Sequence, residues 1–154
     1  MQVIEEFQKL AKDKVGTIYV DRFEDNVRVL IMRGPNSLCA YLGIPLDHPL
    51  SGNSYDDLNI SCNGGLTYAS TGGGEWPKGY FWYGWDYGHC DDMSFYDLTD
   101  SGVKDYKAKS KPWTVKDVES EMWLAVYHMK KLMTIAENAF AKGAKWREAA
   151  KEKP

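Results

Sequence analysis

The sequence has few cysteines and no long apolar run. Cys39, Cys62 and Cys90 are odd in number and irregularly spaced, without a CxxC pair, which argues against a disulfide framework and a structural zinc site. No window approaches the roughly 18 apolar residues of a membrane span, and the start, MQVIEEFQKLAKDK, lacks the apolar stretch of a signal peptide. We therefore expect reduced thiols and a cytoplasmic protein.

Positive charge is also scarce. The net charge is -3 and the pI is about 5.6, whereas a binder of duplex nucleic acid relies on lysines and arginines that neutralise phosphates. A small charged ligand is still compatible, because a local nest of backbone amides can oppose the overall sign. The GxSxG, HExxH, P-loop and GxGxxG motifs are absent. The sequence therefore predicts no metal and no cofactor.

The remaining patterns predict one α+β domain over residues 1–154. Apolar residues at helical spacing predict a short helix over 3–13, and β-rich runs over 17–23 and 27–33 flank Glu24-Asp25-Asn26, which suits a hairpin turn. Further strands are predicted over 38–44, over 58–62 or 65–69 as one broken element, and over 80–86. The sheet region, residues 17–90, is expected to be mainly antiparallel with four to six strands, and residues 91–112 to be irregular.

The strongest periodic signal predicts a long C-terminal helix over 114–150. Thr114 is a suitable N-cap with Asp117 three residues on. Unbroken, this helix would be on the order of 55 Å long, so it either breaks near Gly143 or projects toward a partner. Its apolar stripe consists of Val115, Val118, Met122, Ala125, Met129, Leu132, Ala136 and Phe140.

Aromatic residues are concentrated in one segment, since seven of the twelve residues from Trp76 to Tyr87 are aromatic. Side chains alternate along a strand, so one face is expected to pack on the long helix. On the other, Gly84 would leave a gap between Trp82 and Asp86 for a flat ligand. The alternative is that all these rings belong to the core.

Ionisable and glycine residues lie around this segment. His89 is flanked by Asp86, Asp91 and Asp92, which suits proton transfer, one corner of a metal site, or a purely structural hydrogen bond. The paired glycines of CNGGLTY would let a ligand approach the backbone, although a bulge without a ligand would look the same. A site requires this segment to lie beside the aromatic strand.

Five segments carry a resemblance. LCAYLGIP, DHPLSGNSYDD, NGGLTYAS, WYGWDYGHCDD and KPWTVKDVESE resemble, in the same order, a family of small proteins found mainly in phages and prophages, over about residues 37–125. Asn63 departs from that pattern, which has a histidine before the two glycines. An amide there suits binding better than proton transfer. The resemblance implies a phage accessory protein acting against host defence.

Three hypotheses follow. The first is that the protein binds and sequesters a nucleotide-derived molecule, such as a host immune signal, with Arg28 or Arg33 for the phosphate. The second is a hydrolase with His89 and Asp86 as acid and base. The third is a protein-binding inhibitor that dimerises through the long helix, where Trp123, Tyr127 and Trp146 lie off the main stripe. The expected ligand-binding residues are Asn63, Gly64, Gly65, Thr67, Tyr68, Trp82, Asp86, His89, Asp92, His48 and Tyr55.

Overall fold

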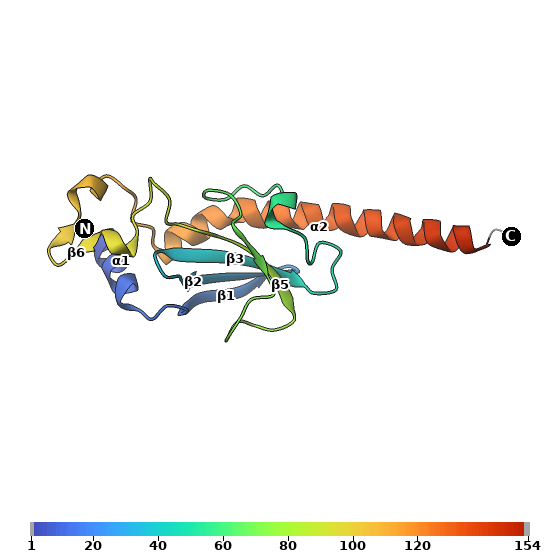
Figure 1. Cartoon of the computed structure of the whole chain (residues 1–154), viewed down its shortest axis with the longest axis horizontal. Helices are drawn as coiled ribbons and strands as arrows, with labels where there is room; N and C mark the ends of the chain where they lie inside the picture. The colour runs from blue at the N-terminus through green and yellow to red at the C-terminus, as the bar shows by residue number, and fades with distance from the viewer. Residues whose placement is uncertain (1, 153–154) are drawn as a thin grey trace.

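The computed structural model is an α+β protein with a helix at each end of the chain (Figure 1). It describes the backbone of residues 2–152 and the side chains of residues 3–143. Helix α1 spans Gln2–Lys12 and helix α2 spans Val115–Glu152. Between them lies a five-stranded antiparallel sheet, so the predicted fold class is confirmed. Within the described residues, no helix is long and apolar enough to cross a membrane.

The sheet has the strand order β1-β2-β3-β5-β4, and all neighbouring strands are antiparallel. The predicted strands at 17–23, 27–33, 38–44 and 80–86 all form, within one residue at each end. Their bounds are Ile18–Glu24 for β1, Val27–Arg33 for β2, Leu38–Pro45 for β3 and Tyr80–Asp86 for β5, with the edge strand β4 at Tyr68–Ser70.

Two local features show where the sheet agrees with the strands predicted from the sequence and where it differs from them. Asp25, in the turn between β1 and β2, has φ of 55°, a left-handed conformation that Asp tolerates better than most residues. Of the two alternatives for the next strand, the one over 65–69 forms only in part, as β4, and the one over 58–62 does not form. Leu58 and Ile60 are buried there, but the Ser61 amide donates to His128 Nδ1 at 3.1 Å instead of to a strand.

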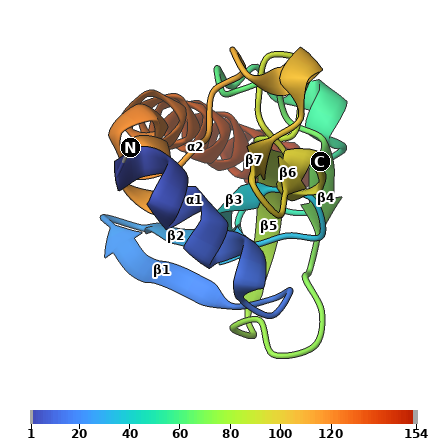
Figure 2. The same cartoon turned by 90° about the vertical axis from the view of Figure 1, so that its left-hand side faces the viewer.

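Helix α2 begins with the expected cap and covers one face of the sheet (Figures 1 and 2). The Thr114 amide donates to Asp117 Oδ2 at 3.1 Å, and the Asp117 amide donates to Thr114 Oγ1 at 3.3 Å, which satisfies two helix-end donors reciprocally. The buried part of its apolar stripe packs against strands β2, β3 and β5 and comprises Val118, Met122, Ala125 and Met129.

The far part of α2 projects beyond the sheet (Figure 1). The helix continues through Gly143 to Glu152, so the break considered near Gly143 does not occur. Ile135 and Phe140 on this part are largely exposed. The side chain of Trp146 lies outside the described residues.

The segment predicted to be irregular, 91–112, contains short elements. A small hairpin forms from β6, Leu98–Thr99, and β7, Gly102–Val103. The chain makes 3-10 turns at Phe95–Asp97 and Asp105–Lys107, and a third lies earlier, at Tyr55–Asp57. Phe95 packs against Phe7 of α1 with ring centroids 4.9 Å apart, which holds α1 across the end of the sheet opposite the projecting helix (Figure 2).

Candidate functional site

Strand β5 separates two apolar clusters, as the alternation of its side chains predicts. Tyr83, Trp85 and Tyr87 belong to the main core beneath α2. Trp82 belongs to a second cluster on the opposite face. The strand therefore supports both layers of the molecule, and its end at Asp86 leads directly into the turn that carries His89.

Trp82 is not available for stacking on a ligand. Its side chain is 0% exposed, and the ring of Trp76 lies over it with a centroid distance of 5.8 Å. The expected gap at Gly84 is filled, because a Cβ atom there would lie 2.3 Å from the Tyr41 ring. The prediction of an open aromatic face on β5 is therefore wrong, since side chains from β3 and from the glycine-rich loop cover it.

The acidic residues around His89 do come together. His89 Nε2 lies 3.6 Å from Asp86 Oδ1, and His89 Nδ1 lies 3.4 Å from Asp92 Oδ2. The Nδ1 atom is buried and has no hydrogen-bond partner. The imidazole is thus held between two carboxylates, with its ring partly exposed.

Asp92 is the most extensively bonded carboxylate in this region. Its side chain accepts hydrogen bonds from Asn63 Nδ2 at 3.1 Å, from the His89 amide at 3.1 Å and from Trp113 Nε1 at 2.7 Å. The residue is 5% exposed. A buried carboxylate is tolerated when donors surround it, and these donors hold three separate segments of the chain together.

The paired glycines lie directly against this cluster. A Cβ atom on Gly64 would lie 2.3 Å from His89 Cε1, so only glycine allows the backbone to approach the imidazole this closely. The segment then enters β4, where Thr67 donates its amide to the Gly84 carbonyl at 2.9 Å. The expected proximity of the paired glycines and the aromatic strand is confirmed.

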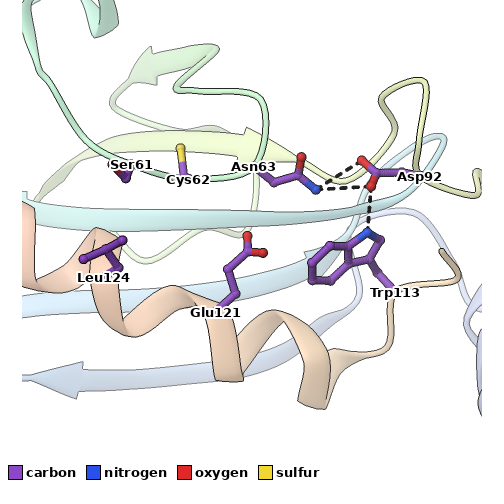
Figure 3. A pocket seen from close by; sticks show the side chains of 7 residues that line it. All are labelled: Ser61, Cys62, Asn63, Asp92, Trp113, Glu121 and Leu124. Atoms are coloured by element: carbon purple, nitrogen blue, oxygen red, sulfur yellow. Dashed lines mark hydrogen bonds between the residues drawn. The ribbon is translucent and has the colours of Figure 1, made fainter.

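A cleft of about 410 Å³ lies beside Asp92, between the 61–63 segment and the start of α2 (Figure 3). In Figure 3 the Glu121 carboxylate rises from α2 toward Asn63, and the Trp113 indole turns its nitrogen to Asp92. We call it the Asp92 cleft. Its lining consists of Ser61, Cys62, Asn63, Asp92, Trp113, Glu121 and Leu124.

The electrostatics of the Asp92 cleft are acidic. Glu121 Oε1 accepts from the Tyr87 hydroxyl at 2.9 Å, and Tyr87 in turn accepts from Trp85 Nε1 at 2.9 Å. Burial, together with the nearby Glu121 carboxylate, raises the pKa of the Cys62 thiol to about 12. Burial is also the main cause that raises the pKa of Tyr87. Both groups are therefore neutral near pH 7, and Asp92 and Glu121 are the acidic residues of the lining.

Two lysines contact residues at the edge of the cleft, and one of them, Lys107, also pairs with Asp97 at 3.8 Å. Lys107 Nζ donates to the carbonyls of Cys90 and Asp92 at 3.0 and 2.9 Å. Lys111 Nζ lies 3.9 Å from the centroid of the Trp113 ring. Positive charge is thus placed next to the cleft, although it is not part of its lining.

Several expected site residues lie elsewhere. His48 Nδ1 accepts from the Leu50 amide at 3.1 Å, and its Nε2 faces Glu137 at 3.7 Å. Glu137 lies roughly 24 Å along α2 from Glu121, at about 1.5 Å per residue, so His48 is remote from the Asp92 cleft. Tyr55 lies in the turn at Tyr55–Asp57, in the same excursion of the chain as His48.

Thr67 and Tyr68 line a smaller cavity of about 160 Å³ next to Asp86, on the other face of the sheet. Tyr68 also packs edge-on against Tyr41, with ring centroids 5.4 Å apart. Gly65 forms a turn in which its amide donates to the Cys62 carbonyl at 3.0 Å. These residues therefore adjoin the cluster without lining the Asp92 cleft.

The two arginines considered for phosphate binding have other partners. Arg33 is buried and donates to the carbonyls of Gly34, Pro35 and Ala11 at 2.6, 2.9 and 2.9 Å. Arg28 forms a two-bond ion pair with Asp21 at 2.8 and 2.9 Å. Neither is positioned at the Asp92 cleft.

Trp113 and Glu121 were not identified from the sequence as site residues. The sequence contains a feature that could have pointed to each of them, because Trp113 directly precedes a helix cap and Glu121 directly precedes a stripe residue, Met122.

Within the described side chains, no three His, Cys, Asp or Glu residues form a group that could hold a metal ion. Comparison of the chain with protein-family models, with curated proteins and with solved structures found no match.

Proposed function

We propose that the protein binds and sequesters a nucleotide-derived small molecule in the Asp92 cleft. The observation that carries this proposal is a cleft of about 410 Å³ whose polar groups are held in place by the three donors on Asp92. A volume of this order falls in the usual range for small-molecule sites. Pre-positioned polar groups lose little freedom when a ligand binds.

The acidic lining selects the kind of base. Asp92 and Glu121 are hydrogen-bond acceptors, so a guest must present N–H donors to them. The exocyclic amino group of adenine, cytosine or guanine fits this requirement. One Glu121 oxygen is already oriented by Tyr87, which leaves the other to accept from the guest.

The phosphate would lie outside the acidic lining, toward Lys111. The ammonium group of Lys111 is next to Trp113 at the edge of the cleft, and a flexible lysine can pair with a phosphate as a point charge. In this arrangement the base of the nucleotide contacts the carboxylates, and its phosphate contacts the ammonium group of Lys111.

Sequestration fits this geometry better than hydrolysis. In the described structure His89 and Asp86 do not line the Asp92 cleft, and the Gly64 backbone covers one edge of the imidazole. A general base must reach the proton that it abstracts.

As a biological setting, we propose that the guest is a nucleotide immune signal of a bacterial host and that the protein is a phage accessory protein that removes it.

Binding is tested by isothermal titration of purified protein with adenosine monophosphate, cyclic adenosine monophosphate and ADP-ribose, each compared with the counterpart that carries unsubstituted purine in place of adenine. We expect the adenine compounds to bind more tightly, because unsubstituted purine lacks the amino donor. Glu121→Gln should weaken adenine binding at least about tenfold. Glu75→Gln, at an exposed position away from the cleft, is the matched control. Equal affinity for the adenine and the unsubstituted-purine compounds would contradict the proposal.

The fate of the guest separates binding from turnover. Lys111→Ala should weaken binding of the phosphorylated compounds but not of adenosine, whereas Lys109→Ala should change neither. After incubation and heat release, mass spectrometry should recover the nucleotide unaltered. Recovery of a cleaved product, lost in His89→Ala, would instead establish the hydrolase.

A further inference from the structure

The apolar positions of α2 form one unbroken seam. Starting at Val118, apolar or small residues follow at alternating steps of four and three, over more than four heptads. This 4-3 alternation is the pattern with which helices pair in coiled coils. The ten seam positions are Val118, Met122, Ala125, Met129, Leu132, Ala136, Ala139, Gly143, Trp146 and Ala150. Trp146 therefore falls on the seam rather than off the stripe.

The sheet covers only the first half of this seam. Phe140 follows Met122 by 18 residues, which is five full helical turns, so both residues point from the same face of α2. Met122 is 1% exposed, whereas Phe140 is 59% exposed. Ile135, which flanks the seam on its other side, is 64% exposed. The same face that the sheet covers near its start is open to solvent farther along.

The open half is long, and the ion pair that its described side chains make with the body is that of Glu137 with His48, at 3.7 Å. Residues 134–152 extend about 28 Å at 1.5 Å per residue, and in proteins helical stability comes mainly from packing of an apolar face. The seam positions there are small, with Ala136, Ala139 and Gly143 in succession. Small residues allow a second helix to approach closely.

We propose that a second copy of this chain covers the open seam, with the two projecting helices antiparallel. When the two helices cross near residue 141, Trp146 lies opposite Ala136 of the other copy and Leu132 lies opposite Ala150. Ala139 lies opposite Gly143. This register sets each large residue at the level of a small one, and the two-fold axis repeats every pairing.

A parallel arrangement lacks this complementarity. It would place Trp146 opposite Trp146 and Gly143 opposite Gly143. Two large residues would then share one level of the interface, and two residues without side chains would share the next. Charge is also consistent with pairing, because the charged residues of the seam half are mostly at outer positions, including Glu137, Lys145 and Glu148. The two bodies lie at opposite ends of such a dimer, so both Asp92 clefts stay open.

Sedimentation equilibrium of the full chain tests the interface. We expect a dimer at micromolar concentration, and Ala139→Glu should weaken dimerisation at least roughly 100-fold because it places a carboxylate in an apolar seam. The control Asn138→Glu adds the same side chain one residue away, on the outer face, and should remain a dimer. Circular dichroism verifies that both variants fold. A monomeric wild type, or equal behaviour of the two variants, would overturn the proposal.

Cysteine pairing tests the orientation. Ala136→Cys and Trp146→Cys are made separately in a Cys90→Ser background, mixed, and oxidised in a glutathione buffer. The antiparallel dimer predicts disulfides between the two different variants. Disulfides within each variant, or none at all, would rule out this arrangement.

Discussion

Asp92 joins more of the candidate site than any other side chain. Its carboxylate takes donors from Asn63, from the His89 amide and from Trp113, which come from three segments. Because the carboxylate is buried, its loss as an acceptor would leave these donors without their present partner.

Asp92→Asn tests this network. The amide keeps the size of the side chain but points an NH2 group at donors, so we expect a loss of about 2 to 4 kcal/mol in the free energy of unfolding. Asp91→Asn, at the exposed neighbouring position, should change it by less than about 0.5 kcal/mol. Urea denaturation measures both, and similar values for the two variants would count against the network.

Gly64 and Gly65 form a matched pair for the contact with His89. Both have a positive φ, 73° and 79°, so an alanine at either position costs about 1 to 2 kcal/mol of backbone strain. Only at Gly64 would the new Cβ meet a neighbour, His89 Cε1 at 2.3 Å. We therefore expect Gly64→Ala to cost clearly more and to shift the NMR signal of His89 Cε1–H, while Gly65→Ala leaves that signal unchanged.

Strand β5 and helix α2 carry the site between them. Tyr87, directly after the strand, donates its hydroxyl to Glu121, and the following turn supplies His89 and Asp92. The helix supplies Glu121 directly, and Trp113 lies just before its cap. The start of α2 must therefore be fixed for the Asp92 cleft to keep its shape.

Thr114→Ala tests that start. Loss of the cap bond to the Asp117 amide should lower the free energy of unfolding by about 1 kcal/mol, and the NMR signal of the Trp113 indole N–H should report the local change. Ser120→Ala removes a hydroxyl that donates within the helix, to the Lys116 carbonyl at 2.9 Å, and should change the free energy by less than about 0.5 kcal/mol. A cap variant as stable as the Ser120 variant would show that packing alone holds this end.

The molecule consists of a packed body and a projecting helix. Met133 is the last residue of α2 that is buried among the described side chains, and Glu137, one turn farther along, lies 3.7 Å from His48. The body should therefore fold without the projection, and the projection should serve association.

Truncation tests this division. A chain that ends after Asn138 should keep its free energy of unfolding within about 1 kcal/mol of the full chain, compared at a concentration where both are monomers, and should no longer dimerise. A chain that ends after Met129 also loses the buried Met133 and should be less stable by about 2 to 5 kcal/mol. Urea denaturation and sedimentation measure the two properties, and unfolding of the longer truncation would contradict the division.

Local patterns in the sequence were sufficient to predict the main helices and strands. The turn at Asp25, the alternation along β5 and the cap at Thr114 depend on neighbours within a few residues, whose backbone preferences are visible in the order of amino acids. The α+β class, the four main strands and the long helix could therefore be predicted. The segment at 58–62 could not, because the Ser61 amide pairs with His128 of α2 rather than with a neighbouring strand.

Tertiary packing determines which side chains are exposed to solvent and which side chains contact one another. Trp82 looks like a stacking surface until Trp76 and Tyr41, from other parts of the chain, cover its face of the sheet. Conversely, Asn63 and Trp113 are 50 residues apart, yet both donate to Asp92. Burial depends on what the rest of the chain places over a residue, so no local pattern could locate the cleft.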